Sequence, residues 1–340
     1  MMISFIILTI ALTGLIFVCR FLWKNGSRFR RMSINLCIGF FALGYTLLAL
    51  EYAFSSFVKI SDGFGFTLAA KKWNETYWKP INSMGYRDKE HPWNEDLGTR
   101  ILFVVGDSFA AGHGIKDVCN RFSDVLARKL GARWEVVVLA RNGWQTDREY
   151  EAMTRYPKKP DRIIVSYCLN DIYSAAVREG APLPELVRRP GPFIRPLVDH
   201  SHLFNFVYWR AYRSLRSATD QYWKYLNKAY QTEKVWLAHT KELSSMLNYA
   251  ADANADICFL IWPHLGDPSV SQGITEKVAR FLADSGALVL DLTPHLRNRK
   301  PHEMMVNSMD GHPNERLHAE VAELLYRKME PWEGSASAVE

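Results

Sequence analysis

Five short apolar runs alternate with stretches of helical pattern through most of the chain. The apolar runs cover residues 101–105, 134–139, 162–167, 256–262 and 287–291. The helical stretches cover about 120–130, 146–156, 225–253, 274–285 and 314–329. Nearly continuous apolar runs are typical of parallel strands that are buried on both faces. The alternation therefore predicts an α/β domain at 101–330, with a parallel five-stranded sheet flanked by helices and a site at the carboxyl ends of the strands.

Residues 172–224 interrupt this alternation. The segment begins with a proline-rich stretch at 181–196 and continues with an aromatic run at 204–209. It follows the end of a predicted strand, so one interpretation is a lid or a wall of the substrate site. The other is a helical insertion that packs on the domain or on a membrane surface.

Two further apolar runs precede the domain, at residues 2–19 and 32–50. Each is close to the roughly 20 residues that a helix needs to cross a bilayer. The basic segment 24–31 between them favours a cytoplasmic loop, which leaves both outer ends of the hairpin on the far side of the membrane. A cleaved signal peptide at 1–25 is the alternative, but this stretch lacks a basic start and a small-residue cleavage site.

These runs predict a two-helix transmembrane anchor at 1–54, with membrane segments at 2–23 and 32–54 and a connecting segment at 55–100. Charge supports this division. Residues 1–54 contain five basic residues and one acidic residue, and so carry +4 of the net charge of +6. The rest of the chain is nearly balanced and lacks the basic surface expected of a nucleic-acid-binding protein.

Polar residues suited to acyl transfer follow the first three predicted strands. Ser108 follows the first strand in a Gly-Asp-Ser-Phe sequence, Gly143 follows the second and Asn170 follows the third. A serine above the sheet is a candidate nucleophile, while a glycine N–H and an asparagine amide are candidate donors to an oxyanion. Each motif taken alone also fits an ordinary turn or helix cap.

Asp310 and His312 stand before the last predicted helix, on an expected loop. A serine hydroxyl becomes a good nucleophile when a base removes its proton, and the base needs a carboxylate to orient it. This pair offers both groups. A capping or structural histidine is the alternative interpretation of His312.

The four motifs in this order resemble those of the SGNH hydrolases, also called the GDSL-like esterase superfamily, over about residues 100–328. Phe109 stands in place of the leucine of the family's name motif. The resemblance implies a flavodoxin-like three-layer α/β/α sandwich, in a membrane-anchored protein of bacterial type. It places the anchor in the inner membrane and the catalytic domain on the periplasmic side.

The resemblance implies a role for each of the five residues. Ser108 is the expected nucleophile, His312 the general base and Asp310 its orienting acid. The backbone N–H groups of Ser108 and Gly143 and the side chain of Asn170 form the expected oxyanion hole. The family usually places the aspartate three residues before the histidine, whereas here the gap is two. Residues 82–88 also resemble a segment that precedes the catalytic strand in bacterial members.

The expected reaction is hydrolysis of an acyl ester through an acyl-enzyme on Ser108, with no metal or organic cofactor. One alternative is an O-acyltransferase that modifies a cell-envelope polysaccharide, since aromatic residues of the insertion suit an acylated glycan. A second is a non-catalytic envelope protein that binds glycans or protein partners. The third, a metal-dependent hydrolase using His312 and His318, is disfavoured because six residues separate the two histidines and do not align them on one helix face.

Overall fold

The computed structural model describes residues 13–14, 16–17, 20, 28–63, 65–91, 98–181, 190–214 and 217–334. By its internal contacts the chain forms two compact units. The first, which we call the N-terminal unit, comprises residues 1–60, 67–69 and 189–211. The second comprises residues 61–66, 70–188 and 212–340, and we call it the catalytic unit because it contains the five residues expected to take part in catalysis. The predicted boundary near residue 54 resembles this division, but residues 189–211 of the insertion group with the N-terminus.

The catalytic unit is built on a five-stranded, all-parallel sheet in the order β2-β1-β3-β4-β5. The strands are β1 (Arg100–Gly106), β2 (Trp134–Ala140), β3 (Arg162–Tyr167), β4 (Asp256–Ile261) and β5 (Leu288–Asp291). This is the flavodoxin-like strand order, and the predicted fold class is confirmed. Because β1 lies between β2 and β3, the carboxyl ends that precede Ser108, Gly143 and Asn170 are neighbours.

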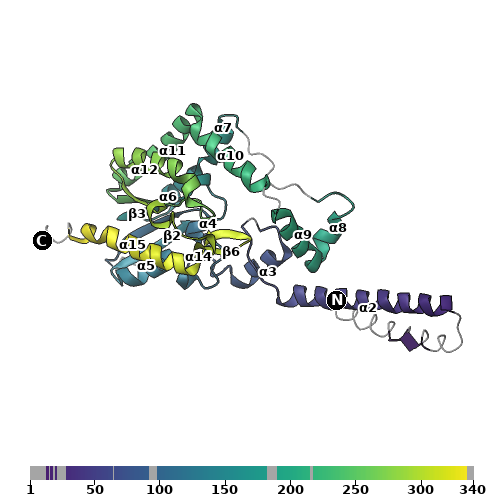
Figure 1. The fold of residues 1–340 in the computed structure, drawn as a ribbon. Coiled ribbons are helices and arrows are strands. Elements are labelled where there is room, and N and C mark those ends of the chain that lie inside the picture. The colour runs from purple at the N-terminus through teal and green to yellow at the C-terminus, as the bar shows by residue number, and fades with distance from the viewer. Residues whose placement is uncertain are drawn as a thin grey trace. The chain divides into compact units, whose positions relative to one another are not determined.

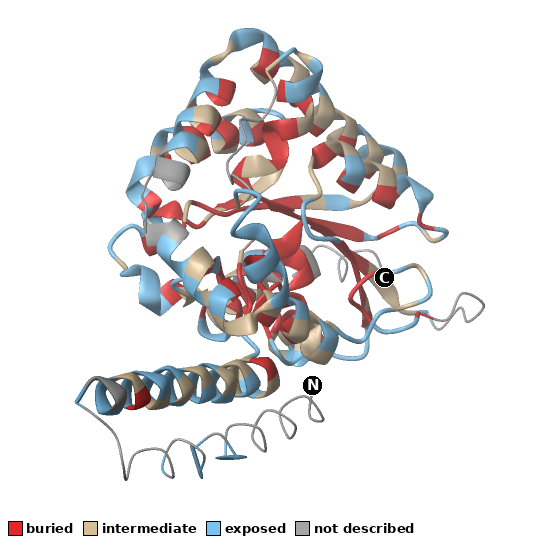
Figure 2. Ribbon diagram, turned by 90° about the vertical axis from the view of Figure 1, so that its right-hand side faces the viewer, coloured by how far each residue is buried: buried red, intermediate tan, exposed pale blue. Residues whose placement is uncertain are grey.

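Both faces of the sheet are covered by helices, so the strands are almost entirely buried (Figures 1 and 2). Successive residues of β1 pack into opposite layers. Phe103 and Val105 join a core with α6 (Thr146–Arg155), α11 (Glu233–Ala253) and α12 (Gln272–Asp284). Leu102 and Val104 join a second core with α5 (Phe122–Leu130) and α15 (Glu315–Gly334). This period of two explains why the strand sequences are continuously apolar.

Further elements lie wholly or, for α3, mostly in the catalytic unit. They are α3 (Leu68–Tyr77), α4 (Ser108–Ala111), α7 (Tyr173–Arg178), α10 (Ser217–Gln231), α13 (Thr293–Leu296) and α14 (Pro301–Met304), with strands β6 (Met305–Asn307) and β7 (Asp310–Pro313) and 3-10 turns at Val118–Asn120, Leu169–Ile172 and Pro268–Ser271.

The prediction of a single helix at 225–253 was wrong, because this stretch is divided into α10 and α11. Thr232 between them has extended backbone angles (φ −78°, ψ 110°) and serves as the N-cap of α11.

The described part of the insertion at 172–224 is mostly helical. It contains α7, α8 (Arg195–His200), α9 (His202–Ser214) and the start of α10. Part of its proline-rich stretch, residues 182–189, lies outside the described residues.

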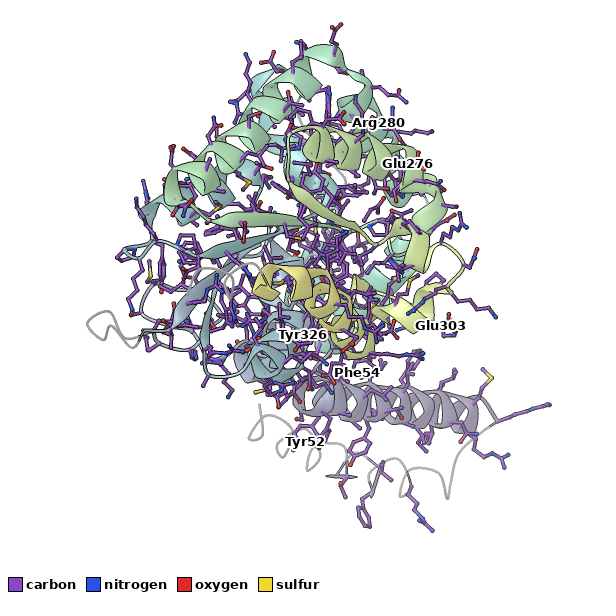
Figure 3. All side chains as sticks on the ribbon, turned by 90° about the vertical axis from the view of Figure 1, so that its left-hand side faces the viewer. Tyr52, Phe54, Glu276, Arg280, Glu303 and Tyr326 are labelled. Carbon is purple, nitrogen blue, oxygen red and sulfur yellow. The ribbon has the colours of Figure 1, made fainter. Side chains whose placement is uncertain are left out.

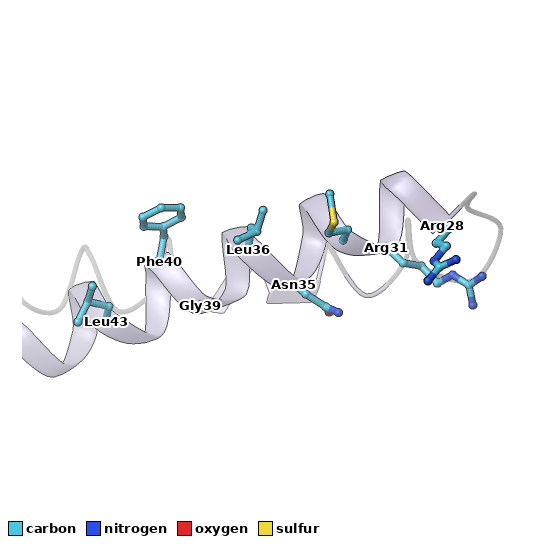
Figure 4. A pocket seen from close by; sticks show the side chains of 8 residues that line it. Arg28, Arg31, Asn35, Leu36, Gly39, Phe40 and Leu43 are labelled. Atoms are coloured by element: carbon cyan, nitrogen blue, oxygen red, sulfur yellow. The ribbon is translucent and has the colours of Figure 1, made fainter.

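Helix α2 (Arg28–Phe57) is the long apolar helix of the N-terminal unit. Its segment Arg31–Phe57 is long and apolar enough to cross a membrane, and only 6% of its most apolar stretch is buried. Leu36, Phe40 and Leu43 project from its surface (Figure 4). The first predicted span, residues 2–23, lies almost entirely outside the described residues. One candidate span is therefore described, where the sequence predicted two.

Candidate active site

Ser108 is the first residue of α4, immediately after β1 ends at Gly106. Asp107 caps this short helix, because its Oδ1 accepts a hydrogen bond of 2.8 Å from Phe109 N. The turn requires glycine at 106, since a Cβ there would lie 2.9 Å from the Cβ atoms of Ala110 and Ser166. Gly106 therefore packs closely against Ala110 and Ser166, and the turn that follows it places Ser108 at the carboxyl edge of the sheet.

Ser108, His312 and Asp310 form one hydrogen-bonded chain. The Oγ of Ser108 lies 2.8 Å from Nε2 of His312, and Nδ1 of His312 lies 2.5 Å from Oδ1 of Asp310. The backbone N–H of His312 also donates to the same carboxylate oxygen, at 3.2 Å. The structure thus brings together three of the five predicted site residues, which come from two segments 204 positions apart.

The segment that carries Asp310 and His312 is strand β7 rather than the expected loop. It pairs with β6 in a two-stranded antiparallel sheet. Residues two apart in a strand face the same side, so Asp310 and His312 are both buried while Gly311 is exposed. Strand geometry is therefore why a gap of two residues, shorter than in the family that the sequence resembles, still produces an Asp–His contact.

The charge state of Asp310 suits an orienting role. Burial alone would raise its pKa, but the neighbouring His312 outweighs this effect and lowers the pKa below its ordinary value. The resulting carboxylate accepts the Nδ1–H of His312. That tautomer leaves Nε2 as the acceptor for the hydroxyl of Ser108.

His113 is a site residue that the sequence analysis missed. Its Nε2–H donates to the carbonyl of Asp62 at 3.0 Å and lies 3.7 Å from Oδ2 of Asp310. Its Nδ1 accepts from the amide of Asn142 at 3.0 Å, and its ring centre lies 4.5 Å from that of His312. Burial, together with the charge of His312, lowers the pKa of His113 to about 4. A neutral His113 therefore packs against the proposed base.

One signal for His113 was present in the sequence. The histidine stands between Gly112 and Gly114, four residues after Phe109 of the Gly-Asp-Ser-Phe sequence. A Cβ at Gly114 would lie 2.4 Å from Val306 and 3.1 Å from Oδ2 of Asp310. This glycine therefore permits the loop to approach β6 and β7, an approach that depends on long-range packing.

The expected oxyanion-hole residues lie at the ends of β2 and β3. The amide of Asn170 donates to Oδ2 of Asp107 at 3.3 Å, the same carboxylate oxygen that lies 3.4 Å from Oγ of Ser108. Gly143 has a φ of +76°, which favours glycine, and it follows the Asn142 that binds His113. Asn170 is thus hydrogen-bonded to Asp107 in the turn that carries Ser108. Gly143 is connected to the site only through the hydrogen bond between its neighbour Asn142 and His113.

Three buried carboxyl groups lie near this edge and were not singled out from the sequence. Burial raises the pKa of Asp107, and it raises those of Glu149 and Asp171 well above ordinary values. Asp171 accepts a hydrogen bond from Cys168 N at 2.9 Å. Asp107 and Asp171 thus organise the turns after β1 and β3, which carry Ser108 and Asn170.

A pocket of about 300 Å³ borders the Asn142 loop. It is lined by Trp78, Gly85, Arg87, Ala140, Arg141 and Asn142. Arg87 is buried, lies over the ring of Trp78 at 4.7 Å and donates to the carbonyls of Tyr77, Gly112 and Ile115. Segment 82–88 therefore fastens the loop that carries His113 to the chain before β1.

His113, Asp310 and His312 also have metal-ligating atoms within 4.8 Å of one another. Nε2 of His113 donates to the carbonyl of Asp62, and Nδ1 of His312 donates to Oδ1 of Asp310, hydrogen bonds that fit proton transfer. His318, the other histidine considered as a ligand, accepts from Phe122 N at 3.2 Å and stacks on the ring of Phe122. These contacts give His318 a packing role between α5 and α15.

Comparisons with known proteins agree with the predicted resemblance. A model of the GDSL-like Lipase/Acylhydrolase family matches residues 104–320. A search of curated proteins found no match.

Several solved structures are similar. The psychrotrophic esterase EstA from Pseudoalteromonas sp. is 13% identical, with 69% of this chain and 99% of that chain covered and a TM-score of 0.41. The native aryl esterase of M. smegmatis is 11% identical, with 68% and 99% covered and a TM-score of 0.41. A carbohydrate acetylesterase family member from Sinorhizobium meliloti is 13% identical, with 68% and 96% covered and a TM-score of 0.38.

Proposed function

Because the chain belongs to the GDSL-like lipase/acylhydrolase family, whose members act on ester bonds, we propose that it is a serine esterase with Ser108 as its nucleophile. The observation that carries this proposal is the hydrogen-bonded chain from Ser108 through His312 to Asp310. The same three side chains are the nucleophile, base and orienting acid of a Ser-His-Asp arrangement.

In the first step Oγ of Ser108 attacks the ester carbonyl while Nε2 of His312 takes the hydroxyl proton. The carbonyl oxygen becomes an oxyanion, which the N–H groups of Ser108 and Gly143 and the amide of Asn170 stabilise in this proposal. Asp310 stabilises the imidazolium that forms. The carbon–oxygen bond to the alcohol then breaks, and His312 gives its proton to the departing alkoxide.

In the second step water attacks the acyl-enzyme. His312 removes a proton from the water, the bond between Oγ and the acyl carbon breaks, and the proton returns to Ser108. The products are a carboxylic acid and the free enzyme. Every proton moves between groups that belong to this chain, the substrate or water.

The test is labelling of the full-length protein with a fluorophosphonate, with the adduct located by mass spectrometry. We expect phosphonylation of Ser108 in the native protein, and its loss in Ser108→Ala and in His312→Ala. A Ser269→Ala variant, which removes an exposed serine far along the chain, serves as the control and should label normally. A folded native protein that leaves Ser108 unlabelled would support a non-catalytic binding protein instead.

A second candidate is transfer of the acyl group to an alcohol other than water. The observation behind it is the pocket beside Asn142, because Arg141 and Asn142 line this pocket with polar groups that suit a sugar hydroxyl or another polar acceptor. Release of the acyl-enzyme in the presence of glycans distinguishes the two reactions. Acylated sugar would indicate an O-acyltransferase of an envelope polysaccharide, whereas free acid alone would indicate an esterase.

We further propose that α2 anchors the enzyme in the inner membrane, with the catalytic unit on the periplasmic side. Its length, its apolar composition and its exposed side chains support the anchor. The basic residues around Arg28 and Arg31 support the orientation, because such residues remain cytoplasmic.

A further inference from the structure

The N-terminal unit has a second apolar surface besides α2. Five large apolar side chains of the segment 193–207 are 39% to 94% exposed: Phe193, Ile194, Leu197, Phe204 and Val207. Leu197 belongs to α8, whereas Phe204 and Val207 are three residues apart on α9 and share one face. We call these five side chains the α8–α9 surface. An exposed apolar cluster of this kind marks a binding surface for protein or lipid.

Glu51 ties this segment to α2. Its carboxylate accepts hydrogen bonds from the backbone N–H groups of His202 and Leu203, at 2.6 and 2.9 Å, and from Oγ of Ser201 at 2.7 Å. A carboxylate at these positions compensates the free N–H groups at the start of α9. The start of α9 is therefore held at the level of Glu51.

The opposite side of the segment is packed. Val198 is buried, and the ring of Phe206 lies edge-on to that of Phe54 in α2, at 5.2 Å. The side chain of Asn205 is buried and binds the backbone at Val198 and Leu68. Since these contacts fix the inner side, the α8–α9 surface faces away from α2.

The position of Glu51 along α2 sets the depth of this surface. Twenty residues separate Arg31 from Glu51, which corresponds to about 30 Å of helix, the thickness of the hydrocarbon core of a bilayer. With Arg31 at the cytoplasmic boundary, Glu51 lies at the outer boundary. Tyr52, which is half exposed beside it, is the kind of residue found at that level (Figure 3).

We propose that the α8–α9 surface lies in the outer leaflet of the membrane, at the boundary between headgroups and acyl chains. The inference rests on the proposed anchoring by α2 and extends it. Helices that lie in this boundary bury an apolar face and keep basic groups near the headgroups. Arg195 and Arg210, which are exposed on the same helices, provide such groups. In this proposal the segment 193–207 is a second membrane contact of the N-terminal unit.

The test uses the full-length protein in nanodiscs of phosphatidylethanolamine and phosphatidylglycerol. An environment-sensitive fluorescent amino acid replaces Leu197 or Val207, and its emission is compared between ordinary lipids and lipids with brominated acyl chains. We expect blue-shifted emission and a loss of fluorescence in the brominated lipid at both positions. Leu237 and Val270 of the catalytic unit, which are exposed to a similar degree, are the matched reference positions with which the quenching is compared.

The same label at Phe40, in the middle of α2, separates the two proposals. Quenching at Phe40 without quenching at Leu197 and Val207 would overturn the α8–α9 proposal and leave the anchor intact. An unquenched Phe40 would overturn the anchor itself. Stronger quenching at all three positions than at Leu237 and Val270 supports both.

Discussion

At the scale of single residues, the proposed chemistry depends on keeping His312 in one tautomer. The short contact between its Nδ1 and Oδ1 of Asp310 performs this task, since a carboxylate can accept but not donate. The remaining nitrogen then faces Oγ of Ser108.

We expect Asp310→Asn to lower kcat/KM roughly 10⁴-fold, because the amide favours the wrong tautomer and cannot stabilise the imidazolium. Steady-state hydrolysis of a small aryl ester measures the effect. Asp267→Asn, which alters a carboxylate that caps the turn Pro268–Ser271, is the control and should leave the rate unchanged. A loss of less than tenfold in Asp310→Asn would mean that another group orients His312.

His113 adds a contact that the reaction scheme alone does not require. We expect His113→Phe to keep the packing against His312 but lose the hydrogen bond to Asn142 next to Gly143. The predicted result is a decrease in kcat of about tenfold, equivalent to roughly 1.4 kcal/mol, with a smaller change in KM.

Separate measurement of kcat and KM checks this prediction. His239→Phe alters another buried histidine, which binds Tyr167 and Glu242, and controls for the loss of a core polar group. Equal effects of the two variants on kcat would contradict a role of His113 in positioning the loop of Asn142 and Gly143, the proposed oxyanion-hole loop.

At the scale of elements, α5 and α15 meet through His318. Its Nδ1 accepts the N–H of Phe122 at the start of α5, and its ring stacks on Phe122. Burial lowers the pKa of His318 to about 3, and the nearby Arg121 acts in the same direction. The histidine is therefore neutral in the folded protein at ordinary pH.

This low pKa makes His318 a source of acid sensitivity. Below pH 6.5 the unfolded chain binds a proton at this residue, whereas the folded chain binds it only near pH 3, so stability falls as the pH decreases through this window. Between pH 6.5 and 4 the contribution is on the order of 3 kcal/mol. We expect His318→Leu to be less stable than the native protein at pH 7 but to lose less stability on acidification.

Urea denaturation of both proteins at pH 7 and pH 4 tests this expectation. Comparison with the variant isolates His318 from carboxyl groups such as Asp171, whose raised pKa changes stability in the opposite direction. His295→Leu, at an exposed position, serves as the control. Parallel pH dependences for the native protein and His318→Leu would contradict the prediction.

At the scale of the whole molecule, the chain combines an N-terminal unit around α2 with a catalytic unit around the sheet. The proposed orientation follows from the basic segment that precedes α2. We expect alkaline phosphatase fused after Glu340 to be active in bacterial cells, because this reporter works only outside the cytoplasm, and we expect the protein in the membrane fraction. Neutralising Lys24, Arg28, Arg30 and Arg31 should reduce the active fraction.

A reporter that is inactive at the C-terminus, in a protein recovered with the membranes, would reverse the orientation. Recovery in the soluble fraction would instead favour the signal-peptide interpretation of residues 1–25. Neither result bears on the proposed esterase activity, because that proposal is tested by labelling of Ser108.

The sequence by itself determined the sheet and placed three of the predicted site residues at the ends of its strands. The apolar runs define β1 to β5, because a strand buried on both faces is apolar at most of its positions. Ser108, Gly143 and Asn170 were predictable as neighbours, since parallel strands bring their carboxyl ends to one edge. The division of 225–253 at Thr232 was not predictable, because both halves share one helical pattern.

Only the tertiary structure decided how the site is completed. Asp310 and His312 face one side because β7 pairs with β6, a long-range contact that local sequence does not encode. His113 reaches Asp310 because Arg87 holds its loop from a distant segment. The α8–α9 segment joins the N-terminal unit through Glu51, about 150 residues away along the chain, and through contacts with Phe54 and Leu68. Such contacts depend on which surfaces meet after folding, and this is why the pattern of the chain alone did not reveal them.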